Sequence, residues 1–232
     1  LNPNNKRISA AIRENINELY LNRKRDDSKE FNENIKLVEI GIVFFVRNAI
    51  KFDLEKLQSL GSNANLVMLE AEKEKLFPPK NNPTEDLQLK IGDQSFNLRM
   101  YIDRADCITE DGSEIVRIID YKTGKDQTVF NFKSIFTIPG ENENKAINQL
   151  LLYCNAYQQL HPEAKQIRPM IYKLLRIRDS GIFYKEPRNN ANQIISFNDS
   201  ASNHKVDNPN NQPTLNDIYL SHMSKVIKDI FD

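Results

Sequence analysis

Two aspartates and a lysine have the side chains that a metal-dependent hydrolytic site needs. Asp103 lies in the string YIDRAD, and Asp120 and Lys122 lie in the string IIDYKTG. Carboxylate oxygens are the hard ligands that Mg²⁺ prefers, and a bound divalent ion lowers the pKa of water and neutralises charge on a reacting phosphate. A nearby ammonium can orient the attacking water or stabilise that charge. These residue types indicate hydrolysis of a phosphodiester, provided that the fold brings them together.

A tight turn between the two strings predicts that they meet. Asp111 and Gly112 form a pair that favours a two-residue type I′ hairpin, because both positions tolerate positive φ. Counting back from this turn places Asp103 directly opposite Asp120, with Cβ atoms about 5 Å apart. Lys122 points to the same face because side chains alternate along a strand. Two adjacent carboxylates repel each other and raise one pKa unless a cation lies between them, so this register favours a metal site.

The same residue types also occur at solvated hairpin edges that have no function. Residue types alone favour that alternative, whereas the sequence around Asp120 favours a site. The preceding run, EIVRII, contains four apolar, β-branched residues, namely Ile115, Val116, Ile118 and Ile119. A carboxylate at the end of such a buried strand rarely lacks a partner.

The elements that must position these residues follow from the spacing of the apolar residues. Helical spacing predicts helices over residues 8–20, 34–60, 145–160 and 213–232. The runs LQLKI, FNLRMYIDRADCI and EIVRIIDYKT are typical of strands, and we interpret them as a meander. Further strands are expected at the start of NLVMLEAEKEKLF and in RPMIYKLLRI, and loops in FNFKSIFTIPGENEN and over residues 189–211. This order predicts an α/β fold with a central mixed sheet, flanked by helices 34–60 and 145–160.

Length and composition fit one domain that needs no disulfide bond or structural metal to fold. The 232 residues can bury a sizeable core, and two cysteines without a C-x-x-C pair support neither a disulfide framework nor a zinc site. Thirty-two basic and 32 acidic residues cancel, so nucleic-acid binding would need a local patch. No run approaches the roughly 20 apolar residues of a membrane span, and the start lacks signal-peptide order. We therefore expect a soluble, cytoplasmic protein without a membrane partner, and a fragment of a longer one.

Three strings resemble the signature blocks of a known nuclease family. YIDRAD, IIDYKTG and QLLLY are similar to hhhDRhD, hhDYKTG and QxxxY of the RecB-like branch of PD-(D/E)xK nucleases. The similarity is greatest to the C-terminal nuclease domain of AddB-type helicase-nuclease subunits and covers residues 66–153. It implies a restriction-endonuclease-like fold and a Mg²⁺- or Mn²⁺-dependent deoxyribonuclease of exonuclease type. It also implies DNA-end processing in recombination and double-strand-break repair, with DNA and a helicase region or subunit as partners.

The resemblance assigns roles at the centre of the site. Asp103 and Asp120 match the two metal-binding acids, and Lys122 matches the catalytic lysine. The backbone carbonyl of Tyr121 matches a further metal ligand. Glu70 matches an acidic position on the preceding strand, where a solvated charge is the alternative.

Other matching residues are expected to bind DNA or to support the site. Gln149 and Tyr153 lie one helical turn apart and match the motif that contacts DNA or steadies the site, with ordinary helix packing as the alternative. Arg104 and Asp106 match positions that support the hairpin by a salt bridge. Two lysines, Lys125 and Lys133, are candidates for contacts to DNA phosphates, or are simply solvated.

Two features of the family pattern are missing from this sequence. No histidine precedes His161, although the family has an upstream helical histidine near the metal, and no cysteine cluster for an iron-sulfur centre follows the last helix. Either the helix with this histidine lies before Leu1 in a longer protein, or this member lacks the group. The intact acids and lysine favour an active nuclease, while the missing histidine favours a catalytically silent DNA-binding or scaffolding module. A phage exonuclease or a CRISPR-adaptation nuclease would share the same chemistry. We expect one nuclease domain over 1–232, with a helical part at 1–60, a catalytic core at 61–188, and a loop and closing helix at 189–232.

Overall fold

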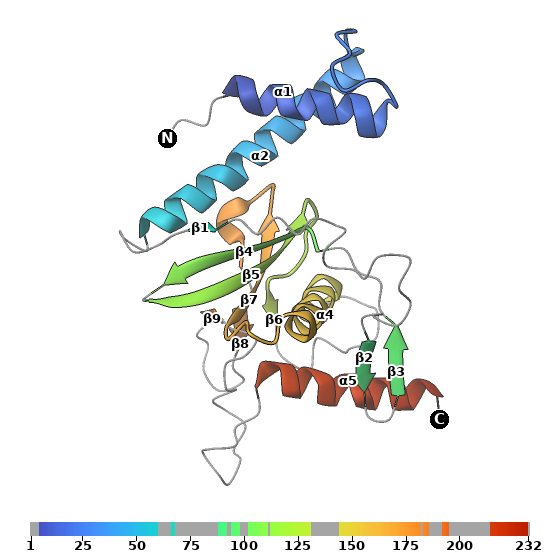
Figure 1. The fold of residues 1–232 in the computed structure, drawn as a ribbon, viewed down its shortest axis with the longest axis vertical. Helices are drawn as coiled ribbons and strands as arrows, with labels where there is room; N and C mark the ends of the chain where they lie inside the picture. Colours follow the sequence, from blue (N-terminus) through green and yellow to red (C-terminus); the bar gives the residue numbers. More distant parts are fainter. Residues whose placement is uncertain are drawn as a thin grey trace.

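The fold is an α/β arrangement in which helices cover a central mixed sheet (Figure 1). The computed structural model describes residues 5–59, 66–67, 88–91, 94–97, 102–110, 112–130, 144–181, 183–185, 192–194 and 214–231. The predicted fold class, a restriction-endonuclease-like mixed sheet flanked by helices, is confirmed.

The central sheet contains four strands in the order β1-β4-β5-β7. They are β1 (Leu66–Val67), β4 (Arg104–Glu110), β5 (Ser113–Lys122) and β7 (Ile167–Lys173). The β1–β4 and β4–β5 pairs are antiparallel, and the β5–β7 pair is parallel. A parallel pair requires a crossover, and α4 (Lys145–Leu160) lies in the connection between β5 and β7.

The β4–β5 hairpin has the predicted register over the whole of β4. Glu110 pairs with Ser113 next to the turn, and Arg104 pairs with Ile119 at the far end. Gly112 has a φ of 77°, in the left-handed region that a type I′ turn requires, whereas Asp111 lies outside the described residues. The ladder ends one residue before the predicted pair of Asp103 and Asp120, because the chain bends at Asp103.

The predicted meander is wrong in one respect. The run FNLRMYIDRADCI is not one strand, since its first residues belong to β3 (Gln94–Asn97) and its last to β4. β3 pairs with β2 (Gln88–Ile91) in a separate two-stranded sheet, and β4 pairs with β1. Apolar and β-branched residues indicate strand conformation but do not specify the partner strand, which explains the error.

A third sheet is formed by three short strands, β6, β8 and β9. They are β6 (Val129–Phe130), β8 (Phe183–Lys185) and β9 (Asn192–Ile194). The loop expected over residues 189–211 therefore contains a strand, and its other residues lie outside the described ranges. The strand expected over 168–177 ends earlier, at Lys173, where its partner β5 also ends, and a 3₁₀ helix, η3 (Ile177–Asp179), follows.

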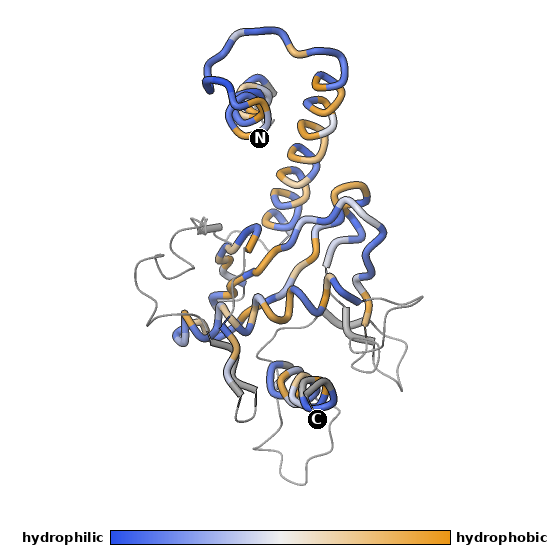
Figure 2. The backbone as a smooth tube through the Cα atoms, turned by 90° about the vertical axis from the view of Figure 1, so that its right-hand side faces the viewer, coloured by the Kyte–Doolittle hydropathy of each residue, from blue (hydrophilic) through white to orange (hydrophobic). Residues whose placement is uncertain are grey.

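The helices agree with the spacing of apolar residues. α1 (Asn5–Asn15) continues as a π-helical turn, η1 (Ile16–Tyr20), and α2 (Glu33–Ser59), α4 and α5 (Leu215–Phe231) match the predicted helices within a few residues. Figure 2 shows α2 extending away from the sheet, with α1 packed at its far end. None of the helices that the structure describes has the length and apolar character needed to cross a lipid bilayer.

The two faces of the sheet are covered by different helices, as predicted. Ile118 and Ile171 pack with α4 in the main core, while Ile119 and Tyr172 pack with the second half of α2. Side chains alternate along a strand, so the even-numbered residues of β5 point towards α4 and the odd-numbered ones towards α2. Asp120 therefore shares the α4 face with Ile118.

Candidate active site

The structure brings Asp103, Asp120 and Lys122 together at one end of the β4–β5 hairpin. Asp120 is nearly the last residue of β5 and only 3% exposed, and Lys122 Nζ lies 2.9 Å from its Oδ2. Asp103 is exposed in the bend before β4, and its Oδ2 accepts a hydrogen bond of 2.9 Å from the Tyr121 N–H. The Asp103 carboxylate thus replaces the backbone carbonyl that would accept this hydrogen bond in a continued β4–β5 ladder. It lies next to Tyr121, the residue between Asp120 and Lys122.

The electrostatics of this end of the hairpin are dominated by negative charge. Burial raises the pKa of the Asp120 carboxyl, the charges of Asp103 and Asp126 add to the increase, and Lys122 opposes it. Burial alone would lower the pKa of Lys122, but its hydrogen bond to Asp120 and the surrounding carboxylates outweigh burial and raise it. The lysine is therefore an ammonium at neutral pH, and the carboxylates still lack full compensation.

Gln149 and Tyr153 extend the site onto α4. Lys122 Nζ donates a hydrogen bond of 3.1 Å to Gln149 Oε1, and Gln149 Nε2 donates one of 2.6 Å to the Tyr153 hydroxyl. Tyr153 is 8% exposed, and burial raises the pKa of its phenol, so the hydroxyl is neutral. This chain of hydrogen bonds holds the ammonium from the side opposite the sheet.

The peptide of Tyr121 faces the same edge as Asp103. The even-numbered residues of β5 form their backbone hydrogen bonds on the β7 side. The Val116 N–H donates to the Gln166 carbonyl, just before β7, and the Lys122 carbonyl accepts from the Leu174 N–H, just after it. The N–H and C=O of one strand residue point to the same side, so the Tyr121 carbonyl points to the β4 side, where its N–H meets Asp103. The carbonyl predicted as a metal ligand thus lies at the edge that carries Asp103.

Arg104 and Asp106 form an ion pair on the other face of the hairpin, towards α2. Sequence reasoning missed the residues that complete this cluster, namely Asp53 of α2, Arg117 of β5 and Tyr172 of β7. One signal was present in the sequence. Asp53 follows Phe52 and lies one turn after Ala49, within the apolar stripe of the helix, where a lone carboxylate needs a buried partner.

A third carboxylate near the site was also missed. Asp126 lies in the loop after β5, and a Cβ built on Gly124 would be only 2.9 Å from Asp126 Oδ2. The side chain therefore folds back over Gly124, and its charge raises the pKa values of both Asp120 and Lys122. The signal was the second aspartate of DYKTGKD, six residues after the first.

The remaining predicted residues lie elsewhere or outside the described part. Lys125 is exposed in the loop after β5, while Glu70 and Lys133 lie outside the described residues. His161 follows α4, where its Nδ1 lies 3.1 Å from Glu163 Oε1. Across the ranges that the structure describes, no three histidine, cysteine, aspartate or glutamate side chains gather as a metal cluster.

Fold and site together define the class of protein. It is an α/β protein whose central hairpin presents two carboxylates and a lysine at one end, beneath a helix. The chain matches the family model of the PD-(D/E)XK nuclease superfamily over residues 16–232 and belongs to that superfamily. No curated protein and no solved structure matched the chain. Nucleases of this superfamily generally use divalent metal ions, and the donor set of Asp103 and Asp120 fits such an ion.

Proposed function

We propose that the chain is a deoxyribonuclease of exonuclease type that hydrolyses phosphodiester bonds with Mg²⁺ or Mn²⁺. The observation that carries the proposal is the buried carboxylate of Asp120, next to Asp103 and 2.9 Å from the ammonium of Lys122. A divalent cation is bound favourably at a buried carboxylate that has an elevated pKa and lies beside a second carboxylate, because the cation relieves the repulsion between the two negative charges. The membership of a nuclease superfamily supports the same conclusion.

Asp103 and Asp120 would hold the metal ion, with the Tyr121 carbonyl as a further ligand. All three donors are hard oxygens, and waters and a phosphate oxygen would complete an octahedron around Mg²⁺. When bound, the ion supplies an activated water and neutralises charge that develops on the phosphate. The Tyr121 N–H keeps the Asp103 carboxylate at the edge of the hairpin through its hydrogen bond of 2.9 Å.

Lys122 would orient the attacking water or stabilise charge on the phosphate. A metal ion competes with its ammonium for Asp120, so the lysine needs a second anchor to remain in the site. Gln149 provides this anchor at 3.1 Å and is itself fixed by the Tyr153 hydroxyl. We therefore assign Gln149 and Tyr153 to positioning of the lysine, with Lys125 as a contact to the DNA backbone.

The biological setting that we propose rests on the three sequence strings rather than on geometry. YIDRAD, IIDYKTG and QLLLY support a RecB-like, AddB-type nuclease that processes DNA ends in recombination and double-strand-break repair. Its partners would be DNA and a helicase region or subunit, and its location the cytoplasm. The proposed domain spans 1–232, with α1 and α2 in the helical part and Asp103 to Tyr153 in the core at 61–188.

Cleavage of end-labelled linear DNA tests the proposal. The wild-type chain should degrade it with Mg²⁺ or Mn²⁺ and not with EDTA, and Asp120→Asn and Lys122→Ala should each abolish degradation. Glu114→Gln is the matched control, because Glu114 is an exposed carboxylate at the other end of β5. Degradation that survives Asp120→Asn would refute the site. A chain that binds DNA but shows no Mn²⁺ binding that depends on Asp103 would instead be a silent DNA-binding or scaffolding module.

A further inference from the structure

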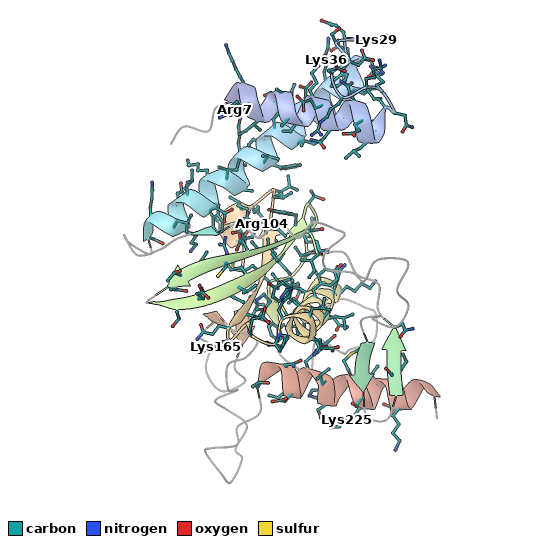
Figure 3. The ribbon with its side chains drawn as sticks, viewed as in Figure 1. Arg7, Lys29, Lys36, Arg104, Lys165 and Lys225 are labelled. Atoms are coloured by element: carbon teal, nitrogen blue, oxygen red, sulfur yellow. The ribbon has the colours of Figure 1, made fainter. Side chains whose placement is uncertain are left out.

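A closed cluster of buried charges lies behind the candidate site, between the hairpin and α2. Asp53 Oδ2 accepts a hydrogen bond of 2.6 Å from Arg104 Nη1, and its Oδ1 accepts one of 2.5 Å from the Tyr172 hydroxyl. Arg117 donates to both oxygens of Asp106, at 2.6 and 2.7 Å. Figure 3 shows Arg104 between the sheet and α2. The cluster joins a helix to both strands of the hairpin.

Charge balance shows why Asp53 is needed. Asp106 and Arg117 both belong to the hairpin, and their bidentate ion pair is balanced without a third residue. Arg104 adds a second guanidinium, whose side chain is only 15% exposed. A buried charge without a counter-charge is strongly unfavourable, so Arg104 requires the carboxylate that Asp53 brings from α2.

Arg104 is also the residue that connects this cluster to the candidate metal ligands. It follows Asp103 directly and forms the last ladder pair of β4, with Ile119. Its Nη1 donates a hydrogen bond of 3.3 Å to the hydroxyl of Tyr121, whose own N–H donates to Asp103. Arg104 thus anchors the chain on both sides of the point where the ladder ends.

Asp103 has little else to hold it. It lies in a bend, outside the β4–β5 ladder, and its side chain is exposed. Among the residues that the structure describes, the hydrogen bond from the Tyr121 N–H is the one that fixes its carboxylate. The direction of Asp103 therefore depends on the position of Arg104 and Tyr121, and through them on Asp53.

We propose that Asp53 is a positioning residue for the metal centre. By holding Arg104 against α2, it fixes Asp103 and the Tyr121 peptide in the geometry that binds a divalent cation. The position of α2 is thereby coupled to metal affinity. The proposal rests on the proposed function, because it takes Asp103 and Asp120 as the metal-binding acids.

Mn²⁺ binding by the whole chain, without DNA, tests this role. Free Mn²⁺ is followed by its electron paramagnetic resonance signal, and folding is checked by circular dichroism and thermal unfolding. Loss of a hydrogen-bond partner of a metal ligand typically weakens metal binding by about 10- to 100-fold, and Asp53 acts one residue further out, through Arg104, so Asp53→Asn should raise the dissociation constant by about tenfold, the lower end of that range. Cleavage by this variant should recover as Mn²⁺ is raised to saturation, because the ligands themselves remain.

Tyr172→Phe is the matched control. It removes the hydrogen bond that the hydroxyl donates to Asp53 and the one that it accepts from Arg117, but leaves the pair of Asp53 and Arg104 intact. It should lower the thermal unfolding temperature, because loss of these two buried hydrogen bonds costs stability. It should leave the dissociation constant for Mn²⁺ unchanged within about twofold, because Arg104 keeps its partner Asp53. If Asp53→Asn does not fold, Arg104→Lys replaces it, since a lysine keeps the charge but cannot reach Tyr121, Asp53 and Asp106 together.

The outcomes separate the two proposals. If Asp53→Asn or Arg104→Lys folds and binds Mn²⁺ like the wild type, the positioning role is overturned and the proposed function is not. Tyr172→Phe that weakens Mn²⁺ binding as much as Asp53→Asn also overturns it, since the effect would then be general destabilisation. If Asp120→Asn binds Mn²⁺ as tightly as the wild type does, the proposed function is overturned, and the positioning role with it.

Discussion

Asp120→Asn should stabilise the metal-free protein and at the same time abolish its response to metal. The wild-type carboxylate is 3% exposed, and burial together with the charge of Asp103 raises its pKa. Its ionised form is thus less favourable in the folded chain than in the unfolded one. Asparagine has a similar shape without the charge, and Lys122 keeps its hydrogen bond to Gln149 and remains partly hydrated at 24% side-chain exposure. In EDTA at neutral pH, the variant should unfold at a higher temperature than the wild type.

The sign of the pH dependence follows from the direction of the shift. A carboxyl whose pKa is raised on folding destabilises the folded state at a pH above that raised value. The penalty disappears as the pH falls through the raised pKa of Asp120 towards the ordinary aspartate pKa of about 3.9. The advantage of Asp120→Asn should therefore be largest at neutral pH and vanish in acid, where the wild-type carboxyl is protonated.

With Mn²⁺ bound, the wild type should become more stable than Asp120→Asn. A ligand at 100 times its dissociation constant stabilises the folded state by about 2.7 kcal/mol. For a domain of this size each kcal/mol corresponds to roughly 2–4 °C, so the wild-type unfolding temperature should rise by roughly 5–11 °C. Asp120→Asn should show little or no increase. Differential scanning fluorimetry with EDTA and with Mn²⁺ measures both effects, and equal shifts in the two proteins would refute the assignment of Asp120 as a ligand.

Three further changes test other parts of the structure. Arg117→Met leaves Asp106 with too little counter-charge and should lower the free energy of unfolding in urea by about 3–5 kcal/mol, whereas Arg25→Met, at an exposed ion pair, should cost below about 1 kcal/mol. Gln149→Leu frees Lys122 on one side, and single-turnover assays should show cleavage slowed by about 10- to 100-fold without a change in fold. Gly112→Ala has open space for its Cβ but a φ of 77°, so chemical denaturation should show a loss of about 1–2 kcal/mol.

The hairpin could be predicted from the sequence because its signals are local. The Asp-Gly turn set the register, the alternation of side chains set the faces, and both appear in a run of fewer than twenty residues. The register held from Glu110 to Arg104. It did not predict the bend at Asp103, where a carboxylate replaces the backbone as hydrogen-bond acceptor. Alternation describes a regular strand and carries no information on where the strand ends.

The cluster around Asp53 could not be predicted, because its contacts connect distant parts of the chain. Asp53 and Arg104 are 51 residues apart, and Asp53 and Tyr172 are 119 apart. The helix, the hairpin and β7 each have a readable local pattern, but no local pattern specifies which buried carboxylate meets which guanidinium. The same limit explains why β1, and not β3, is the neighbour of β4.

Two buried aspartates on the same hairpin show how a structural carboxylate differs from a metal ligand. Asp106 is fully buried, and the guanidiniums of Arg104 and Arg117 both pair with it. Asp120 is almost as buried, but among the described residues it pairs with one lysine, which it shares with Gln149, and it lies near Asp103. A carboxylate that stabilises a fold needs its charge cancelled, whereas a ligand must keep its charge available. Charge is balanced in the cluster of Asp53, Asp106, Arg104 and Arg117, whereas Asp103, Asp120 and Asp126 outnumber the lysine at the candidate site, so a divalent cation would balance the site and is not needed in the cluster behind it.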